Sequence, residues 1–126
     1  MRVLLDTSTF LFALESPGRL SAAARRVFSK SSFERELSVI SFVEIAIKRE
    51  SGKFTFTRDD VRKGINDLEL RVLPISEEHA MRMFELPALH PDPFDRQLIA
   101  QALAEDIPIV TCDEAFERYR GLKVIW

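Results

Sequence analysis

Short apolar runs alternate with helical patterns along this 126-residue chain, and this alternation restricts the fold more than any other feature. The runs are too short and too apolar to be exposed strands, so they favour buried central strands. Such an alternation is typical of an α/β sandwich around a mostly parallel sheet. We therefore expect an α/β fold with five strands, at residues 2–5, 37–40, 71–73, 109–111 and 123–125, and helices at residues 8–14, 21–28, 42–50, 58–70, 77–84, 93–105 and 114–119.

Local signals support several helix boundaries. Thr57 and Asp92 each precede an acid by three residues, which is the spacing of an N-cap. Pro93 suits the first position of a helix, and Gly52 can adopt the positive φ that ends the helix before it.

Composition limits the domain organisation. A hydrophobic content of 46% is enough for one continuous core, and no linker or repeat divides the chain, so we expect one domain over residues 1–126. No apolar stretch is long enough to cross a bilayer, and MRVLLD does not resemble a signal segment, so we expect a cytoplasmic protein without membrane contact. The single cysteine, Cys112, excludes an internal disulfide and a cysteine zinc site, and we expect it to be a buried filler.

The charge balance gives little attraction for nucleic acid. The formal net charge is −2, from 18 basic and 20 acidic residues. Binding of RNA would then need a local basic surface, with negative charge gathered elsewhere at a metal site. A solvated helical face explains any one of these residues better than RNA binding does, but the best candidates for such a surface are Lys48, Arg49, Lys53, Arg58, Arg62 and Lys63.

Four acids follow strands or open helices. Asp6 ends the first strand, and Glu44 lies in the first turn after the second strand. Asp95 lies in the first turn of the helix that begins at Pro93, and Asp113 follows the strand that ends at residue 111. Because ligands bind outside the carboxyl ends of parallel strands, we expect these four side chains to meet at one edge of the sheet.

Two of these acids have structural explanations from their neighbours. Glu44 with Ser41 spells a capping box, and Glu44 can also pair with Lys48 one turn later. Asp95 could be the reciprocal partner of an N-cap at Asp92. The sequence leaves these alternatives open.

The other two acids, Asp6 and Asp113, could each cap the helix that follows. For Asp6 this explanation is weaker, because Thr7, Ser8 and Thr9 offer neutral caps at the same place.

Asp95 also lies on the face of its helix that should pack on the sheet. It shares a stripe with Leu98, Ile99 and Ala102, and only the adjacent Arg96 could curl back to pair with it. Clustered carboxylates repel one another unless a divalent cation neutralises them. Oxygen ligands without nearby His or Cys select Mg²⁺ or Mn²⁺, so we expect one of these ions as cofactor.

Such a site favours attack of water on a phosphodiester with help from a metal ion. His79 and His90 are too far apart to form a helical ligand pair, and we expect each to be a surface histidine. The chain has neither a G-x-S-x-G elbow nor the glycine spacing of a P-loop.

Four motifs, LLDTSTFLFAL, SFVEIAIK with the following GK, HPDPFDRQLIAQAL and IVTCDEAFERY, occur in the order typical of VapC-like PIN domains. The chain resembles this family over nearly its whole length. The resemblance implies a three-layer α/β fold and a Mg²⁺-dependent endoribonuclease that serves as the toxin of a toxin–antitoxin pair. The acidic positions of the family fall on Asp6, Glu44, Asp95 and Asp113.

The resemblance also implies further site residues and partners. Asp92, Ser8 and Thr111 are second-rank site residues, and the two hydroxyls would orient a carboxylate or a water. A cognate antitoxin would lay its C-terminal segment across the active-site groove, and the chain would form a homodimer. Apolar side chains of the early helices could serve either contact, although core packing explains each of them as well: Phe10, Leu11, Leu14 and Phe28.

This chain departs from close relatives at Ser8, where they often have His, and at Phe12, where they often have Trp. These departures concern substrate detail, because all four acids are present. A haloacid dehalogenase-like phosphatase would need an acid at residue 8, and a receiver-like module would need paired acids after the first strand. A non-catalytic PIN module that uses the acidic pocket for an ion or partner is the remaining alternative.

Overall fold

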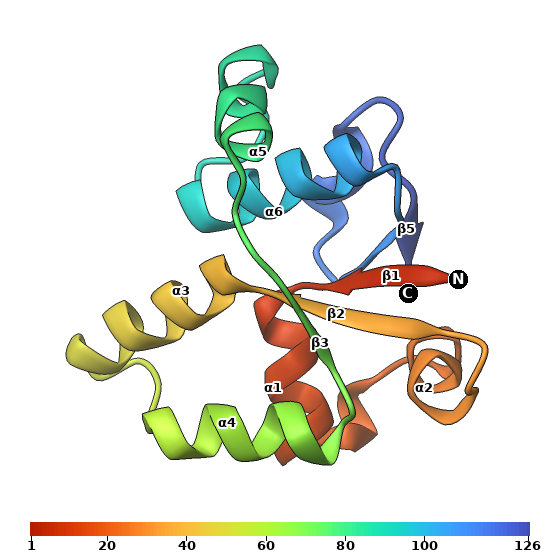
Figure 1. The fold of residues 1–126 in the computed structure, drawn as a ribbon, viewed down its shortest axis with the longest axis vertical. Coiled ribbons are helices and arrows are strands. Elements are labelled where there is room, and N and C mark those ends of the chain that lie inside the picture. The colour runs from red at the N-terminus through yellow and green to blue at the C-terminus, as the bar shows by residue number, and fades with distance from the viewer.

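A parallel five-stranded sheet lies at the centre of the computed structural model, which describes residues 1–126 (Figure 1). The strand order is β3-β2-β1-β4-β5, and every neighbouring pair is parallel. The expected α/β fold is confirmed. The strands are β1 (Arg2–Leu5), β2 (Glu34–Ser38), β3 (Arg71–Leu73), β4 (Ile109–Val110) and β5 (Val124–Ile125).

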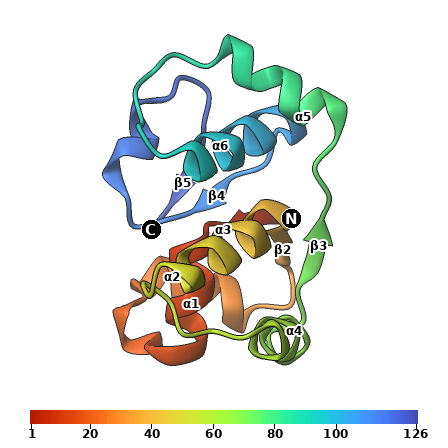
Figure 2. The ribbon, with the colours of Figure 1, turned by 90° about the vertical axis from the view of Figure 1, so that its left-hand side faces the viewer.

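Helices cover both faces of the sheet and produce the expected three layers (Figures 1 and 2). One face carries α1 (Thr7–Glu15), α2 (Ala22–Ser29) and α4 (Arg58–Asp67). The other carries α5 (Glu77–Arg82) and α6 (Pro93–Glu105), while α3 (Val39–Glu50) contacts both α1 and α6. The helices are all too short or too polar to cross a membrane. Short 3₁₀ segments are η1 (Pro17–Arg19), η2 (Met83–Glu85) and η3 (Glu114–Arg118).

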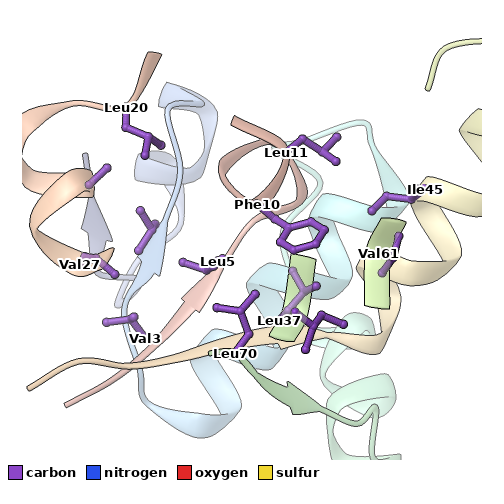
Figure 3. Packing of buried hydrophobic residues seen from close by; sticks show 13 residues of the cluster. Val3, Leu5, Phe10, Leu11, Leu20, Val27, Leu37, Ile45, Val61 and Leu70 are labelled. Atoms are coloured by element: carbon purple, nitrogen blue, oxygen red, sulfur yellow. The ribbon is translucent and has the colours of Figure 1, made fainter. Parts of the chain in front are cut away.

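The central strand β1 supplies both hydrophobic cores. Successive side chains of a strand point to opposite faces. Val3 and Leu5 therefore enter the cluster under α1, α2 and α4, which Figure 3 shows, whereas Leu4 enters the cluster under α6. All three side chains are fully buried. This burial holds the carboxyl end of β1 between the two helical layers.

The second strand lies earlier in the chain than expected, at Glu34–Ser38. Val39 and Ile40 belong to α3, because the Ser38 side chain accepts a hydrogen bond from the backbone N–H of Ile40 and caps the helix there. The first residues of this strand are charged, so the sequence lacks the apolar run expected of a buried strand there. Glu36 is buried within β2, where Arg2 of β1 donates two hydrogen bonds to its carboxylate.

Two expected helices end differently in the structure. The helix expected at 58–70 stops at Asp67, because Glu69 adopts a left-handed φ of 53° and the chain turns into β3. The helix expected at 114–119 is the 3₁₀ segment η3. The helix at 93–105 has the expected bounds.

The helix caps follow the sequence signals with two exceptions. Asp95 is not the reciprocal partner of the Asp92 cap, because the backbone N–H of Asp92 donates to His90 Nδ1. Thr57 and Asp60 form a capping box, and Gly52 has a φ of 81°. The capping box expected between Ser41 and Glu44 is wrong, because α3 begins at Val39 and places both residues inside the helix, where they are buried.

The apolar side chains of the early helices are less exposed than expected. Phe10 and Leu11 are buried in the core, and Leu14 and Phe28 pack against it partly buried, so the expectation of an exposed contact surface there is wrong for Phe10 and Leu11. The large apolar side chains that are exposed on the helical segments are instead Val43 and Ile47 of α3 and Met81 and Phe84 of α5 and η2.

Gly64 lets α4 approach α1 closely. A Cβ at this position would lie 2.5 Å from Leu14 Cδ1 and 3.1 Å from Phe10 Cζ. Alanine normally stabilises a helix relative to glycine by about 1 kcal/mol. We expect Gly64→Ala to lower the free energy of unfolding by about 1–2 kcal/mol instead, because the core must shift to admit the methyl group. Denaturant unfolding measures this change. In a Leu14→Ala background the same substitution should stabilise the protein, and destabilisation there would contradict the packing explanation.

Candidate active site

Three aspartates at the carboxyl edge of the sheet each cap a helix. Asp6 follows β1 and caps α1, Asp92 caps α6, and Asp113 follows β4 and caps η3. In each case Oδ1 accepts a backbone N–H, from Thr9, Phe94 and Ala115, at 2.8, 2.8 and 2.9 Å. Because Oδ1 is held by the cap, each side chain has one orientation, and Oδ2 makes a separate contact.

The Oδ2 atom of Asp6 accepts a 2.6 Å hydrogen bond from the Thr111 hydroxyl. The Thr111 oxygen in turn accepts the backbone N–H of Asp113 at 3.0 Å, so one threonine links two acids. Burial raises the pKa of Asp6, although hydrogen bonds from Thr111 and Thr9 oppose the shift. The structure therefore places the hydroxyl of Thr111 where it orients a carboxylate.

His90 joins two further acids. Its Nε2 lies 2.8 Å from Asp113 Oδ2 and 3.3 Å from Asp95 Oδ2. Its Nδ1 accepts the backbone N–H of Asp92 at 3.1 Å, and its own backbone N–H donates to the Tyr119 hydroxyl. Since Nδ1 is an acceptor, Nε2 carries a proton and donates a hydrogen bond to Asp113, with Asp95 close beside it.

The tautomer of His90 bears on metal binding. His90, Asp95 and Asp113 offer ligand atoms that all lie within 4.8 Å of one another. A histidine nitrogen must be free of its proton to bind a metal. With Nδ1 accepting from the backbone, Nε2 is a donor that holds Asp113, so the atoms of this group that remain available to a cation are the carboxylate oxygens.

Asp95 experiences the strongest electrostatic effect of the cluster. Burial is the largest cause that raises its pKa, the charges of Asp92, Glu44 and Asp6 add to it, and His90 opposes them, so that the pKa is about 7. Three other carboxylates therefore act on Asp95 from three different elements. We call the group of Asp6, Glu44, Asp92, Asp95 and Asp113 the acidic centre. Its carboxylates outnumber the positive charges beside them.

Glu44 reaches this centre from the second turn of α3. It is buried, with Oε1 accepting a 2.6 Å hydrogen bond from the Thr7 hydroxyl and Oε2 in contact with Lys48 Nζ. Its charge raises the pKa of both Asp6 and Asp95. The expected alternative of a Glu44–Lys48 pair is confirmed, and the pair lies inside the acidic centre.

The ammonium group of Lys48 also lies 3.7 Å from Asp92 Oδ2. Burial lowers its pKa, but contact with Glu44 and the charges of Asp92 and Asp95 outweigh this effect, so the net shift is upward. Lys48 therefore remains a full positive charge beside the acids.

The four acids predicted from the sequence form two pairs in this centre, which differ in their distance from His90. Asp95 and Asp113 contribute oxygens to the compact group around His90. Asp6 and Glu44 act on Asp95 through their charge but do not belong to that group. Of the second-rank residues, Asp92 and Thr111 contact the centre, whereas Ser8 is exposed and its role stays a prediction.

Sequence reasoning missed two residues of the centre. His90 is buried, contrary to expectation, and its position two residues before N-cap Asp92 was the available signal. Thr7 donates to Glu44 across 37 positions of sequence, and no local pattern indicates that contact.

Three other expectations about polar residues need correction. His79 is buried in a capping box with Ser76 and contacts Glu105, so it is a structural residue and not a surface histidine. Arg96 donates to the Pro87 carbonyl and does not pair with Asp95. Cys112 is exposed and is not a buried filler.

The expected basic surface is divided in the structure. Lys48 points into the acidic centre, and Lys63 pairs with Asp67. A cavity of about 510 Å³ lies between α3 and α4, and its lining includes Arg49, Arg58 and Arg62.

The raised pKa of Asp95 leads to a pH-dependent stability. The folded carboxyl titrates near 7 and the unfolded one near 3.8, so the folded state holds an extra proton between these values. Stability must then fall as pH rises through this window. In chelator, we expect the wild type to lose on the order of 2 kcal/mol more than Asp95→Asn between pH 5 and pH 8. Thermal unfolding at both pH values measures the difference, and equal losses would contradict the raised pKa.

Several solved structures have the same fold. The chain is similar to one in the VapBC2 complex of Rickettsia felis bound to promoter DNA, with a TM-score of 0.72 and 15% identity over 98% of this chain and 97% of that chain. VapBC-1 of nontypeable Haemophilus influenzae gives a TM-score of 0.70 at 20% identity, covering 98% and 96% of the two chains. DNA-bound VapBC of Salmonella typhimurium gives 0.68 at 19%, with the same coverage.

Sequence comparison agrees with the fold. No curated protein shows significant similarity to the chain. The model of the PIN domain family, however, matches residues 3–122. The match includes all four predicted acids and His90. The chain belongs to the PIN domain family.

Proposed function

We propose that this chain acts as a single PIN domain over residues 1–126 and is a VapC-type toxin, a Mg²⁺-dependent endoribonuclease that a cognate antitoxin inhibits. Membership of the PIN family supports the nuclease class. The similar structures come from VapBC complexes, and another is described as a toxin–antitoxin complex from Klebsiella pneumoniae.

The observation that carries this proposal is the electrostatic environment of Asp95. Its carboxyl is largely removed from water, and Asp92, Glu44 and Asp6 all act on it with negative charge. Helix capping explains Asp6 and Asp92 one at a time, but it does not explain why their charges and that of Glu44 all act on one point. The convergence supports a centre built to receive positive charge.

The donor set fits a hard divalent cation. We propose Asp6, Glu44, Asp95 and Asp113 as the acids that hold it, with Mg²⁺ preferred and Mn²⁺ also accepted, because the available donors are carboxylate oxygens. The only nearby histidine uses Nε2 as a donor. A cation held there would activate water and neutralise charge on a phosphodiester.

The chain's own residues would hold these acids in position. Thr111 and the N–H of Thr9 hold Asp6, and His90 holds Asp113 and lies beside Asp95. A carboxylate oxygen that the ion leaves free would take the proton of the attacking water. Arg49, Arg58 and Arg62 in the cavity between α3 and α4 are our candidates for contacts with RNA phosphates.

The same proposal includes two protein partners and a cellular location. A segment of the antitoxin would cover the acidic centre in the cytoplasm and block RNA. A second copy of the chain would form a homodimer, and exposed apolar side chains such as Met81 and Phe84 are available for either partner. A non-catalytic PIN module is the alternative that the following experiment separates.

We expect Asp6→Asn and Asp95→Asn each to lower the rate of RNA cleavage by at least about 100-fold, because each removes a charge that holds the cation. Cleavage of a mixed RNA pool by purified protein measures this, with Mg²⁺ and with chelator. Asp67→Asn is the matched control, since this aspartate is exposed on α4 and pairs only with Lys63.

The control variant should cleave like the wild type. Cleavage that survives both chelation and the two substitutions would refute the proposed mechanism. A wild type that binds Mn²⁺ without cleaving any RNA would favour the non-catalytic alternative.

The homodimer has an independent test. Light scattering of the free protein should give twice the 14.5 kDa of one chain. A mass of one chain across the micromolar range would refute this part of the proposal and leave the nuclease proposal unaffected.

A further inference from the structure

Lys48 has an unusual position for a lysine on a helix. Its Nζ contacts Glu44 Oε2 one turn away and lies 3.7 Å from Asp92 Oδ2, on a different helix cap. The rings of Phe54 and Phe94 lie 5.6 and 5.9 Å from the ammonium group. Only 22% of the side chain is exposed.

A second lysine–acid pair with the same spacing shows what is special here. Lys63 and Asp67 on α4 also lie four residues apart, but their side chains are 76% and 54% exposed. Such exposed pairs contribute little and are screened by salt. The buried Lys48 pair is therefore not explained by helix stabilisation alone.

Lys48 is also the only side chain with a permanent positive charge that pairs with the acidic centre. No lysine or arginine forms an ion pair with Asp6, Asp95 or Asp113. Thr7 holds Oε1 of Glu44 and Lys48 contacts Oε2, so a cation that bound Glu44 through Oε2 would meet the ammonium group of Lys48.

We propose that Lys48 is a tethered counter-ion that competes with the divalent cation for Glu44 and moves away from Oε2 when the cation binds. This inference rests on the proposed function, because it requires a metal site. Two cations in contact with one carboxylate oxygen repel each other strongly in a partly buried site. The tethered ammonium thus keeps Glu44 and Asp92 neutralised while no metal is bound, and it weakens the binding of the metal.

The proposal is tested by whether removal of the Lys48 charge tightens or weakens the binding of Mn²⁺. Lys48→Met keeps most of the apolar stem and removes the charge, so we expect it to bind Mn²⁺ about tenfold more tightly than the wild type. Calorimetry or electron paramagnetic resonance of free Mn²⁺ gives the affinity without reference to activity. A lysine that merely supported the structure would give weaker binding when removed.

Two control variants define the effect. Lys48→Arg keeps the charge and should bind Mn²⁺ with nearly the affinity of the wild type. Lys63→Met removes a charge from the exposed pair and should change nothing. The proposal is overturned if Lys48→Met binds Mn²⁺ no more tightly than the wild type, or if Lys48→Arg binds it as tightly as Lys48→Met does.

A measurement on the wild type avoids dependence on the folding of a variant. Acylation of lysines, followed by mass spectrometry, reports how accessible each ammonium group is. We expect Lys48 to react faster when Mg²⁺ is added, whereas Lys63 should react at an unchanged rate. Slower or equal labelling of Lys48 with Mg²⁺ contradicts displacement.

One further variant separates the two proposals. If the wild type does not bind Mn²⁺, or if Asp95→Asn binds it as well as the wild type does, the proposed metal site itself fails. If that binding is present and Lys48→Met does not tighten it, only the inference about Lys48 fails.

Discussion

The N-caps at the carboxyl edge of the sheet are the constraint on which the site depends. Asp6, Asp92 and Asp113 each give one oxygen to a helix N-terminus and keep the other for a second partner. A capped aspartate has little rotational freedom, and the positive end of the helix stabilises its charge. These aspartates can therefore serve both as helix caps and as site residues, because the cap fixes the orientation of the carboxylate.

Outside this centre, buried charge is paired with an opposite charge. The buried carboxylate of Glu36 in β2 is matched by Arg2. No buried polar side-chain atom lacks a hydrogen-bond partner. Only at the acidic centre do several like charges act on one another, and Asp95 shows the result in its raised pKa. Such a local departure from charge matching is typical of functional sites.

Local patterns predicted the elements where one physical signal dominated. The helix α6 has an N-cap, a proline at its first position and a long apolar stripe, and its bounds agree with the expectation. The strand β2 was misplaced because its first residues are charged and because Val39 and Ile40, which favour strands, lie in a helix. The pairing of Glu36 with Arg2 is a contact between strands, and no single window of sequence contains it.

The sequence by itself determined the alternation of strands and helices, the order of the motifs and the placement of acids directly after strands. These are local properties, since apolar periodicity and capping act over a few residues. Only the tertiary structure decided that His90 lies between Asp95 and Asp113, that Thr7 holds Glu44, and that Lys48 also reaches Asp92. Those contacts join different elements, so they exist only once the sheet and its two helical layers have brought distant residues within hydrogen-bonding distance.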